Sequence, residues 1–216
     1  MSTRSALLVV ALLATHARAQ PSAQPDCAPE ADRLRAHLVE AERSTFRWNL
    51  GWTVAFGAAS AGQLALALAE WNPGGEFDAK YRDTLYVGAA KAGIGFASRI
   101  VLPLRTHVPM PRADRCAELV ALRTSVSDLA IKERRLFWLT HIGGTALNLA
   151  GAALLWQRHS FSTGAVSFVI SYPVGVASAY TLPRKSWKLW RAERAQWMVT
   201  ASASGEQATL SLGGSW

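Results

Sequence analysis

The sequence is poor in the residues from which disulfide-rich scaffolds and metal sites are built. It has two cysteines in 216 residues, which excludes a scaffold held by many disulfides and a zinc site made from four cysteines. Charged residues make up 18% of the chain, below the ~25% that is usual for soluble domains. Because half of the residues are apolar, a disordered tail protein is excluded as well.

Sequence motifs for catalysis are also missing. The chain contains no G-x-S-x-G motif, no P-loop and no G-x-G-x-x-G motif. Its histidines form no H-x-x-x-H or H-E-x-x-H pair, so no metal site is indicated. We therefore expect a protein that is not an enzyme and that uses no cofactor and no metal.

The first 19 residues are typical of a secretory signal peptide. Arg4 precedes the apolar run Ala6–Ala14, and Ala17-Arg18-Ala19 has the small residues of a cleavage site. The apolar run is too short to cross a bilayer as a helix, although an uncleaved anchor is the alternative. Residues 20–26 are then predicted to be a flexible spacer.

The remaining chain is predicted to contain two copies of one unit, at residues 27–104 and 105–183. Each copy has a charged amphipathic stretch followed by two apolar runs. Five positions match at an offset of 80: Gly95, Ala97, Ser98, Leu102 and Pro103 recur as Gly175, Ala177, Ser178, Leu182 and Pro183. Such self-similarity indicates two repeated structural units, while shared Ala-rich composition is the alternative.

Four segments reach the ~20 residues that a membrane helix needs. Leu50–Ala69, Phe137–Gln157 and Ser160–Pro183 contain no Asp, Glu, Lys or Arg, and Leu85–Leu104 is interrupted by two basic residues. Tryptophans lie near the segment ends, where aromatic rings prefer the headgroup level of a bilayer. The sequence thus predicts four transmembrane helices, arranged as two duplicated helical hairpins. Buried core helices of a soluble protein are the alternative.

The amphipathic stretch of each copy carries one narrow apolar seam. Its members are spaced by alternating steps of three and four residues, as in a coiled coil: Ala31, Leu34, Leu38, Ala41, Thr45 and Trp48 in the first copy, and Leu119, Leu122, Val126, Leu129, Glu133 and Leu136 in the second. We expect long helices over Pro29–Glu70 and Ala117–Trp156, whose seams pair into a stalk outside the membrane.

The two cysteines then lie together at the far tip of this stalk. Because export leads to an oxidising compartment, Cys27 and Cys116 are expected to form a disulfide. Two free thiols are the alternative.

The C-terminal segment, residues 184–216, differs from the rest. It begins with a basic stretch, and Met198–Ser204 and Ala208–Leu212 then alternate in polarity around Gly205-Glu206-Gln207. This pattern predicts a β-hairpin. The expected fold class is therefore an all-α membrane protein with four transmembrane helices, a two-helix extramembrane stalk and a small C-terminal β-hairpin.

Two signals disagree about the topology of this protein. A cleaved signal peptide places the stalk and the C-terminus outside the cytoplasm. Lys and Arg number 16 on the stalk side and 3 in the opposite loops, and the positive-inside rule would place the larger number in the cytoplasm. We follow the signal peptide, because export of the first segment fixes the start of the chain and the cysteine pair agrees with it. Acidic residues beside those bases indicate salt-bridged helices. A reporter fused at Trp216 is expected to work only outside the cytoplasm.

Lys91 and Arg99 are the candidate ligand-binding residues. A cation within a membrane segment is costly and marks a functional site by default. The two residues are about two helical turns apart, so they share a broad face that can bind an anion between the repeats. Extension of Arg99 to the membrane surface is the alternative.

The expected function is that of a non-enzymatic structural or accessory subunit of the cell envelope, acting through its stalk and hairpin. Its expected partners are the lipid bilayer and either another protein or a second copy of the chain; export argues against nucleic acid. The alternative function is a small transporter or channel component with an anion site at Lys91 and Arg99.

Overall fold

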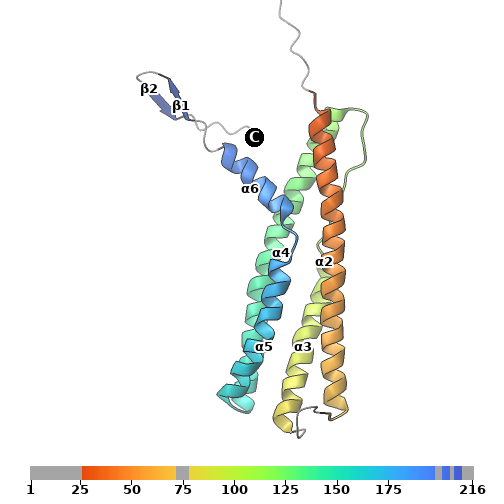
Figure 1. Ribbon diagram of the computed structural model, residues 1–216, viewed down its shortest axis with the longest axis vertical. Coiled ribbons are helices and arrows are strands. Elements are labelled where there is room, and N and C mark those ends of the chain that lie inside the picture. Colours follow the sequence, from red (N-terminus) through yellow and green to blue (C-terminus); the bar gives the residue numbers. More distant parts are fainter. Residues whose placement is uncertain (1–25, 72–77, 198–200, 205–206, 211–216) are drawn as a thin grey trace, which may run out of the picture.

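The computed structural model describes residues 26–71, 78–197, 201–204 and 207–210. These residues form five helices: α2 (Ala28–Leu68), α3 (Ala79–Val101), α4 (Arg115–Arg158), α5 (Phe161–Tyr180) and α6 (Lys185–Trp197). α2 packs on α3 and α4 packs on α5 along one long axis, while α6 projects away from the bundle (Figure 1). The expected signal peptide lies outside the described residues, as does all but the last residue of the spacer.

α2 and α4 are single uninterrupted helices of 41 and 44 residues. At ~1.5 Å per residue each is roughly 60 Å long. Pro29 lies in the first turn of α2, where its missing N–H is not needed. The side chain of Asp114 caps α4 by accepting hydrogen bonds from the backbone N–H groups of Cys116 and Ala117. Both helices begin at one end of the bundle, so they run parallel.

The stalk is the half of the bundle where α2 and α4 begin, and it is held by the predicted seams. The buried residues in this half of α2 are the six seam residues, Ala31, Leu34, Leu38, Ala41, Thr45 and Trp48. α4 contributes buried Leu119, Leu122, Val126, Leu129 and Glu133. The apolar members form one core cluster, which also includes Leu104 and Leu182. Heptad spacing therefore turns one narrow face of each helix toward the other.

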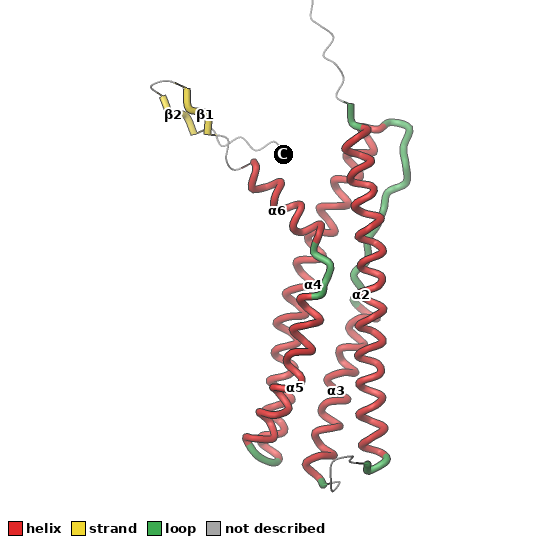
Figure 2. Tube along the Cα trace, viewed as in Figure 1, coloured by secondary structure: helices red, strands yellow, loops and turns green. Residues whose placement is uncertain are grey.

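The connection between α3 and α4 climbs beside the stalk (Figure 2). It covers residues 102–114 between the end of α3 and the start of α4. The backbone carbonyl of Leu104 accepts a hydrogen bond from Asn49 Nδ2 at 2.8 Å, and that of Pro109 accepts one from Arg35 Nη1 at 2.9 Å. This anchored connection returns the chain to the tip before α4 starts.

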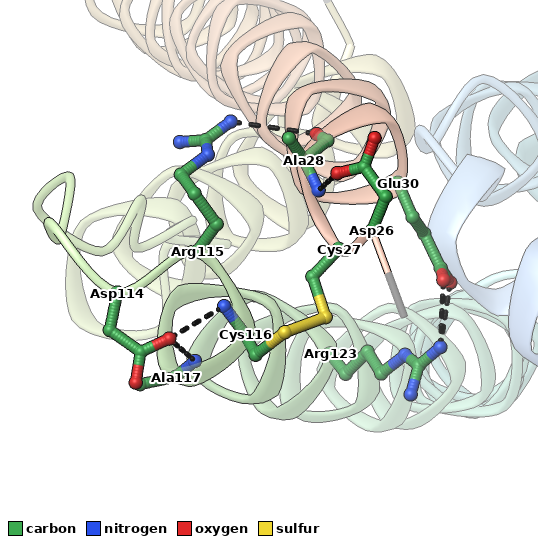
Figure 3. Close-up of a disulfide and its surroundings, with 9 residues drawn as sticks. All are labelled: Asp26, Cys27, Ala28, Glu30, Asp114, Arg115, Cys116, Ala117 and Arg123. Atoms are coloured by element: carbon green, nitrogen blue, oxygen red, sulfur yellow. Dashed lines mark hydrogen bonds and ion pairs between the residues drawn. A yellow bond between two sulfur atoms is a disulfide. The ribbon is translucent and has the colours of Figure 1, made fainter. Parts of the chain in front are cut away.

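The tip is closed by a disulfide between Cys27 and Cys116, the pair that the sequence singles out (Figure 3). The two Cα atoms are 5.1 Å apart, and the bond encloses a sequence separation of 89 residues. Close by, both side-chain carboxylate oxygens of Glu30 accept hydrogen bonds from Arg123 Nη2, at 2.9 and 2.8 Å. The starts of α2 and α4 are thus joined covalently, and an ion pair links the first turn of α2 to the third turn of α4.

Charged groups of the stalk pair across helices. The fully buried carboxylate of Glu118 accepts hydrogen bonds from Arg35 and Arg115. The hydrogen bond from Arg35 is the main reason that the pKa of Glu118 is lowered. Arg115 also pairs with Asp32, and Lys185 pairs with Glu40. Part of the positive charge of the stalk therefore has an acidic partner within the protein.

The prediction of four membrane spans is wrong. In the part of the chain that the structure describes, two helices, α2 and α5, are long and apolar enough to cross a membrane by length and composition. The charges of Lys91 and Arg99 interrupt the apolar run of α3. In α4, His141, Asn148 and small residues dilute the leucines. Absence of Asp, Glu, Lys and Arg was therefore too weak a criterion.

The prediction that a C-terminal β-hairpin forms part of the fold is also corrected, because the fold is built from helices. Beyond α6 the described residues contain two strands of four residues each, β1 (Ala201–Ser204) and β2 (Gln207–Leu210), paired antiparallel. Extensive contacts join these strands only to each other. The predicted strands over Met198–Ser204 and Ala208–Leu212 extend outside the described residues. The described residues of β1 and β2 make no extensive contact with the helices.

Candidate functional site

A cavity of about 1170 Å³ lies between the two pairs of helices and is lined by residues of α2, α3, α4 and α5. Small and apolar side chains form most of its wall, among them Gly88, Gly144, Ile94 and Val174. The cavity occupies the half of the bundle away from the disulfide, which we call the cavity half. α3 and α5 approach each other closely over only part of their length, which leaves room for it.

Both candidate binding residues of the sequence line this one cavity. Lys91 and Arg99 reach it from α3, and Lys80 adds a third cation from the start of the same helix. The described residues that line the cavity include no Asp or Glu. The wall therefore carries three formal positive charges without an acidic side chain to balance them.

Lys91 is held by serines of α5. Its Nζ donates hydrogen bonds to Ser171 Oγ at 2.8 Å and to Ser167 Oγ at 3.4 Å. A Cβ atom added to Gly151 of α4 would lie 2.9 Å from Lys91 Cδ. The missing side chain of Gly151 thus gives the lysine stem room to cross between the helices.

Arg99 is the most enclosed of the three cations, with 5% of its surface exposed. Its Nη2 donates a hydrogen bond to Ser178 Oγ at 2.8 Å, and the guanidinium carbon lies 4.3 Å from the ring centre of Trp48. Its buried Nε has no hydrogen-bond partner among the described residues. The side chain does not extend to the surface, which was the alternative considered from the sequence.

The serine partners are what the sequence analysis missed. The offset of 80 already aligned Lys91 with Ser171, and the structure brings these two side chains into contact. Ser178, the bonding partner of Arg99, is itself the counterpart of Ser98. The signal was therefore present for Lys91, but the alignment alone did not indicate that Lys91 and Ser171 face each other across the bundle.

A second polar cluster fixes the start of α6. The buried carboxylate of Glu133 accepts a hydrogen bond from the backbone N–H of Trp187 at 2.7 Å. Ser186, also buried, bonds through its hydroxyl to His37 Nε2 at 2.9 Å. Burial raises the pKa of Glu133 to about 7, although the hydrogen bonds that it accepts and Arg184 oppose the shift. Glu133 thus serves as an acceptor at the N-terminus of a helix, where exposed N–H groups need one.

Comparison of the chain with protein-family models, with curated protein sequences and with solved structures finds no match. The function is therefore argued from the geometry of the cavity and of the helix surfaces.

Proposed function

We propose that this chain is an integral membrane protein of the cell envelope with a non-enzymatic structural or accessory role. The observation that carries the proposal is the exposure of the two helices, α2 and α5, that contain an apolar window of span length. The apolar window of α2 is 6% buried within the protein, and that of α5 is 11% buried. The core helix of a water-soluble protein would have most of such a window buried, whereas a lipid-facing helix would not.

The exposed apolar residues follow one another along the cavity half. α2 exposes Val54 and Leu68, and α5 exposes Phe161 and Val169. Exposed apolar residues along two helices are unfavourable in water and are typical of contact with a membrane or another protein. Lipid is the occupant that we propose, because the exposure follows the long axis of the helices.

The stalk supports a place outside the cytoplasm. Disulfides persist mainly in oxidising compartments, and Cys27 and Cys116 form one. Pairing of Arg35 and Arg115 with Glu118 offsets part of the positive charge that the positive-inside rule counts. In this proposal the stalk presents a surface to another protein or to a second copy of the chain.

Insertion into the membrane is tested with two matched lysine substitutions. Val169 of α5 and Val120 of α4 are 68% and 65% exposed, respectively, but only Val169 lies in a candidate span. Val169→Lys should release protein from the membrane fraction or destabilise it, because a central lysine costs about 2.5–3.5 kcal/mol in a span. Val120→Lys should have little effect. Recovery of the folded wild-type monomer from the aqueous fraction without detergent would overturn the proposal.

A second candidate function, a small transporter or channel component, is favoured by the cations of the cavity. Lys91 and Arg99 line one space that no described acidic side chain shares. The substitution Lys91→Leu separates the two candidates. A purely structural protein should keep or gain stability without this cation, whereas an anion pathway should lose anion flux in reconstituted vesicles.

A further inference from the structure

We propose that the cavity binds an anionic amphiphile, with the oxyanion of its headgroup between Lys91 and Arg99 and its hydrocarbon chain along the apolar wall. This inference rests on the proposed membrane location and adds a ligand class to it. Its evidence is the bonding state of the two cations, the charge of the wall and the size of the space.

The two cations have unused donors. A lysine ammonium carries three N–H donors, and Lys91 uses two of them on Ser171 and Ser167. The guanidinium of Arg99 carries five donors, of which Nη2 bonds Ser178 and the buried Nε bonds no described residue. Serine hydroxyls orient these groups without neutralising them. The third N–H of Lys91 and the remaining Nη donors of Arg99 are therefore available to a ligand, whereas the buried Nε is enclosed by the protein.

The unpaired positive charges of the cavity wall favour binding of an anion. A buried cation without a partner is strongly unfavourable, and no described acidic residue lines the cavity to act as that partner. The stalk of the same protein pairs Arg35, Arg115 and Lys185 with carboxylates. Because the protein supplies counter-charges there and none in the cavity, the ligand is the remaining source of negative charge.

The size and composition of the cavity favour an amphiphile over a small ion. Drug-sized ligands occupy pockets of about 300–1,000 Å³, and this cavity is about 1170 Å³. An inorganic phosphate would leave most of that volume unfilled. The wall beyond the cations includes Leu147, Val166 and Ile170, which suit a hydrocarbon chain.

The test measures lipid binding by native mass spectrometry of the detergent-solubilised full chain. The probes are dioleoylphosphatidylglycerol, dioleoylphosphatidylcholine and inorganic phosphate. We expect the wild type to retain the anionic lipid in preference to the zwitterionic one. Lys91→Leu should weaken retention of the anionic lipid about tenfold, equivalent to losing one interaction of ~1.4 kcal/mol.

The matched control is Lys132→Leu, which removes an exposed cation of α4 outside the cavity. It should leave lipid retention unchanged. Arg99→Lys is a second variant, which keeps the positive charge but loses the planar guanidinium group. It should also weaken lipid retention, because only a guanidinium can bind an oxyanion through two parallel N–H groups.

Three results would overturn the inference. Equal loss of retention in Lys91→Leu and Lys132→Leu would indicate unspecific attraction of charge. Equal retention of both lipids would exclude recognition of the anion. Displacement of the bound anionic lipid by inorganic phosphate would make the site one for a small ion. Each differs from failure of the membrane proposal, which the aqueous recovery of the wild-type chain would reveal without any lipid measurement.

Discussion

The stalk and the cavity half use the same helices in opposite ways. In the stalk, α2 and α4 bury an apolar seam and pair their charges on the surface or across the helices. In the cavity half, apolar residues face outward, while Lys91 and Arg99 face an interior space. Under the proposed membrane location, this difference matches two surroundings along one bundle. Water would surround the stalk, and lipid would surround the cavity half.

The largest effect is expected at the covalent end of the stalk. Replacing both cysteines, Cys27→Ser with Cys116→Ser, removes a crosslink over 89 residues. This should lower the free energy of unfolding by about 2–4 kcal/mol, because the unfolded chain gains conformational freedom. Denaturant titration of the detergent-solubilised protein, followed by circular dichroism, measures the loss. Reduction of the wild type should reproduce it, and an unchanged midpoint in both would contradict the prediction.

The next comparison places one leucine substitution in each region of α4. Leu122 is fully buried in the stalk seam, whereas Leu149 is 53% exposed in the cavity half. Leu122→Ala should cost about 2–4 kcal/mol of unfolding free energy, because it leaves a cavity. Leu149→Ala should cost less than about 1 kcal/mol in detergent. Equal losses in the same titration would remove the distinction between a packed stalk and an outward-facing apolar surface.

A smaller and pH-dependent effect is expected at the joint between the stalk and α6. The pKa of Glu133 is raised from 4.5 to about 7, so the folded protein holds a proton that the unfolded chain releases. The contribution of this group to stability is present below about pH 4.5 and is lost as the pH rises through about 7.

Glu133→Gln removes this titration but keeps an oxygen that can accept from Trp187. The variant should therefore be more stable than the wild type at pH 8 by about 1 kcal/mol, and this advantage should shrink toward pH 5. Thermal unfolding at the two pH values tests the prediction. An advantage that grows toward pH 5 would have the wrong sign, and would assign the carboxylate a stabilising negative charge at α6.

The smallest effect is expected for the exposed ion pair between Arg123 and Glu30. Arg123→Ala should change the free energy of unfolding by less than about 1 kcal/mol, because exposed pairs are well solvated. The change should vanish in 1 M salt, where the screening length is about 3 Å. A larger loss that persists in high salt would indicate that the arginine stem contributes packing at the tip.

Local pattern was sufficient for the long helices and for the stalk. The spacing of Ala31, Leu34 and Leu38 identified the face that is buried, because a helix places residues three and four apart on one side. The same spacing predicted the parallel packing of α4 on α2, and with it the juxtaposition of Cys27 and Cys116. The seams depend on residues that are near one another in sequence. The cysteine pair depends on two residues at the same position relative to the start of two similar helices.

Composition alone was a poor guide to the membrane segments and to the tail. Four charge-poor runs were predicted as spans, and two described helices meet the requirement of length and hydropathy. A hairpin over Met198–Ser204 and Ala208–Leu212 was predicted as an element of the fold. The fold is helical, and strand pairing among the described residues of the tail is confined to two segments of four residues. Both errors arose because local pattern does not measure how apolar a whole helix is or whether a short strand finds a surface to pack on.

The sequence by itself determined the helices, the buried seam and the two cations on one face of α3, because each follows from the period of the helix. Only the tertiary structure decided that Ser171 and Ser178 orient those cations, that no described carboxylate neutralises them in the cavity, and that Glu133 holds α6. These contacts join residues 54 to 80 positions apart. Their formation depends on how the helices are placed around one another, which no local spacing specifies.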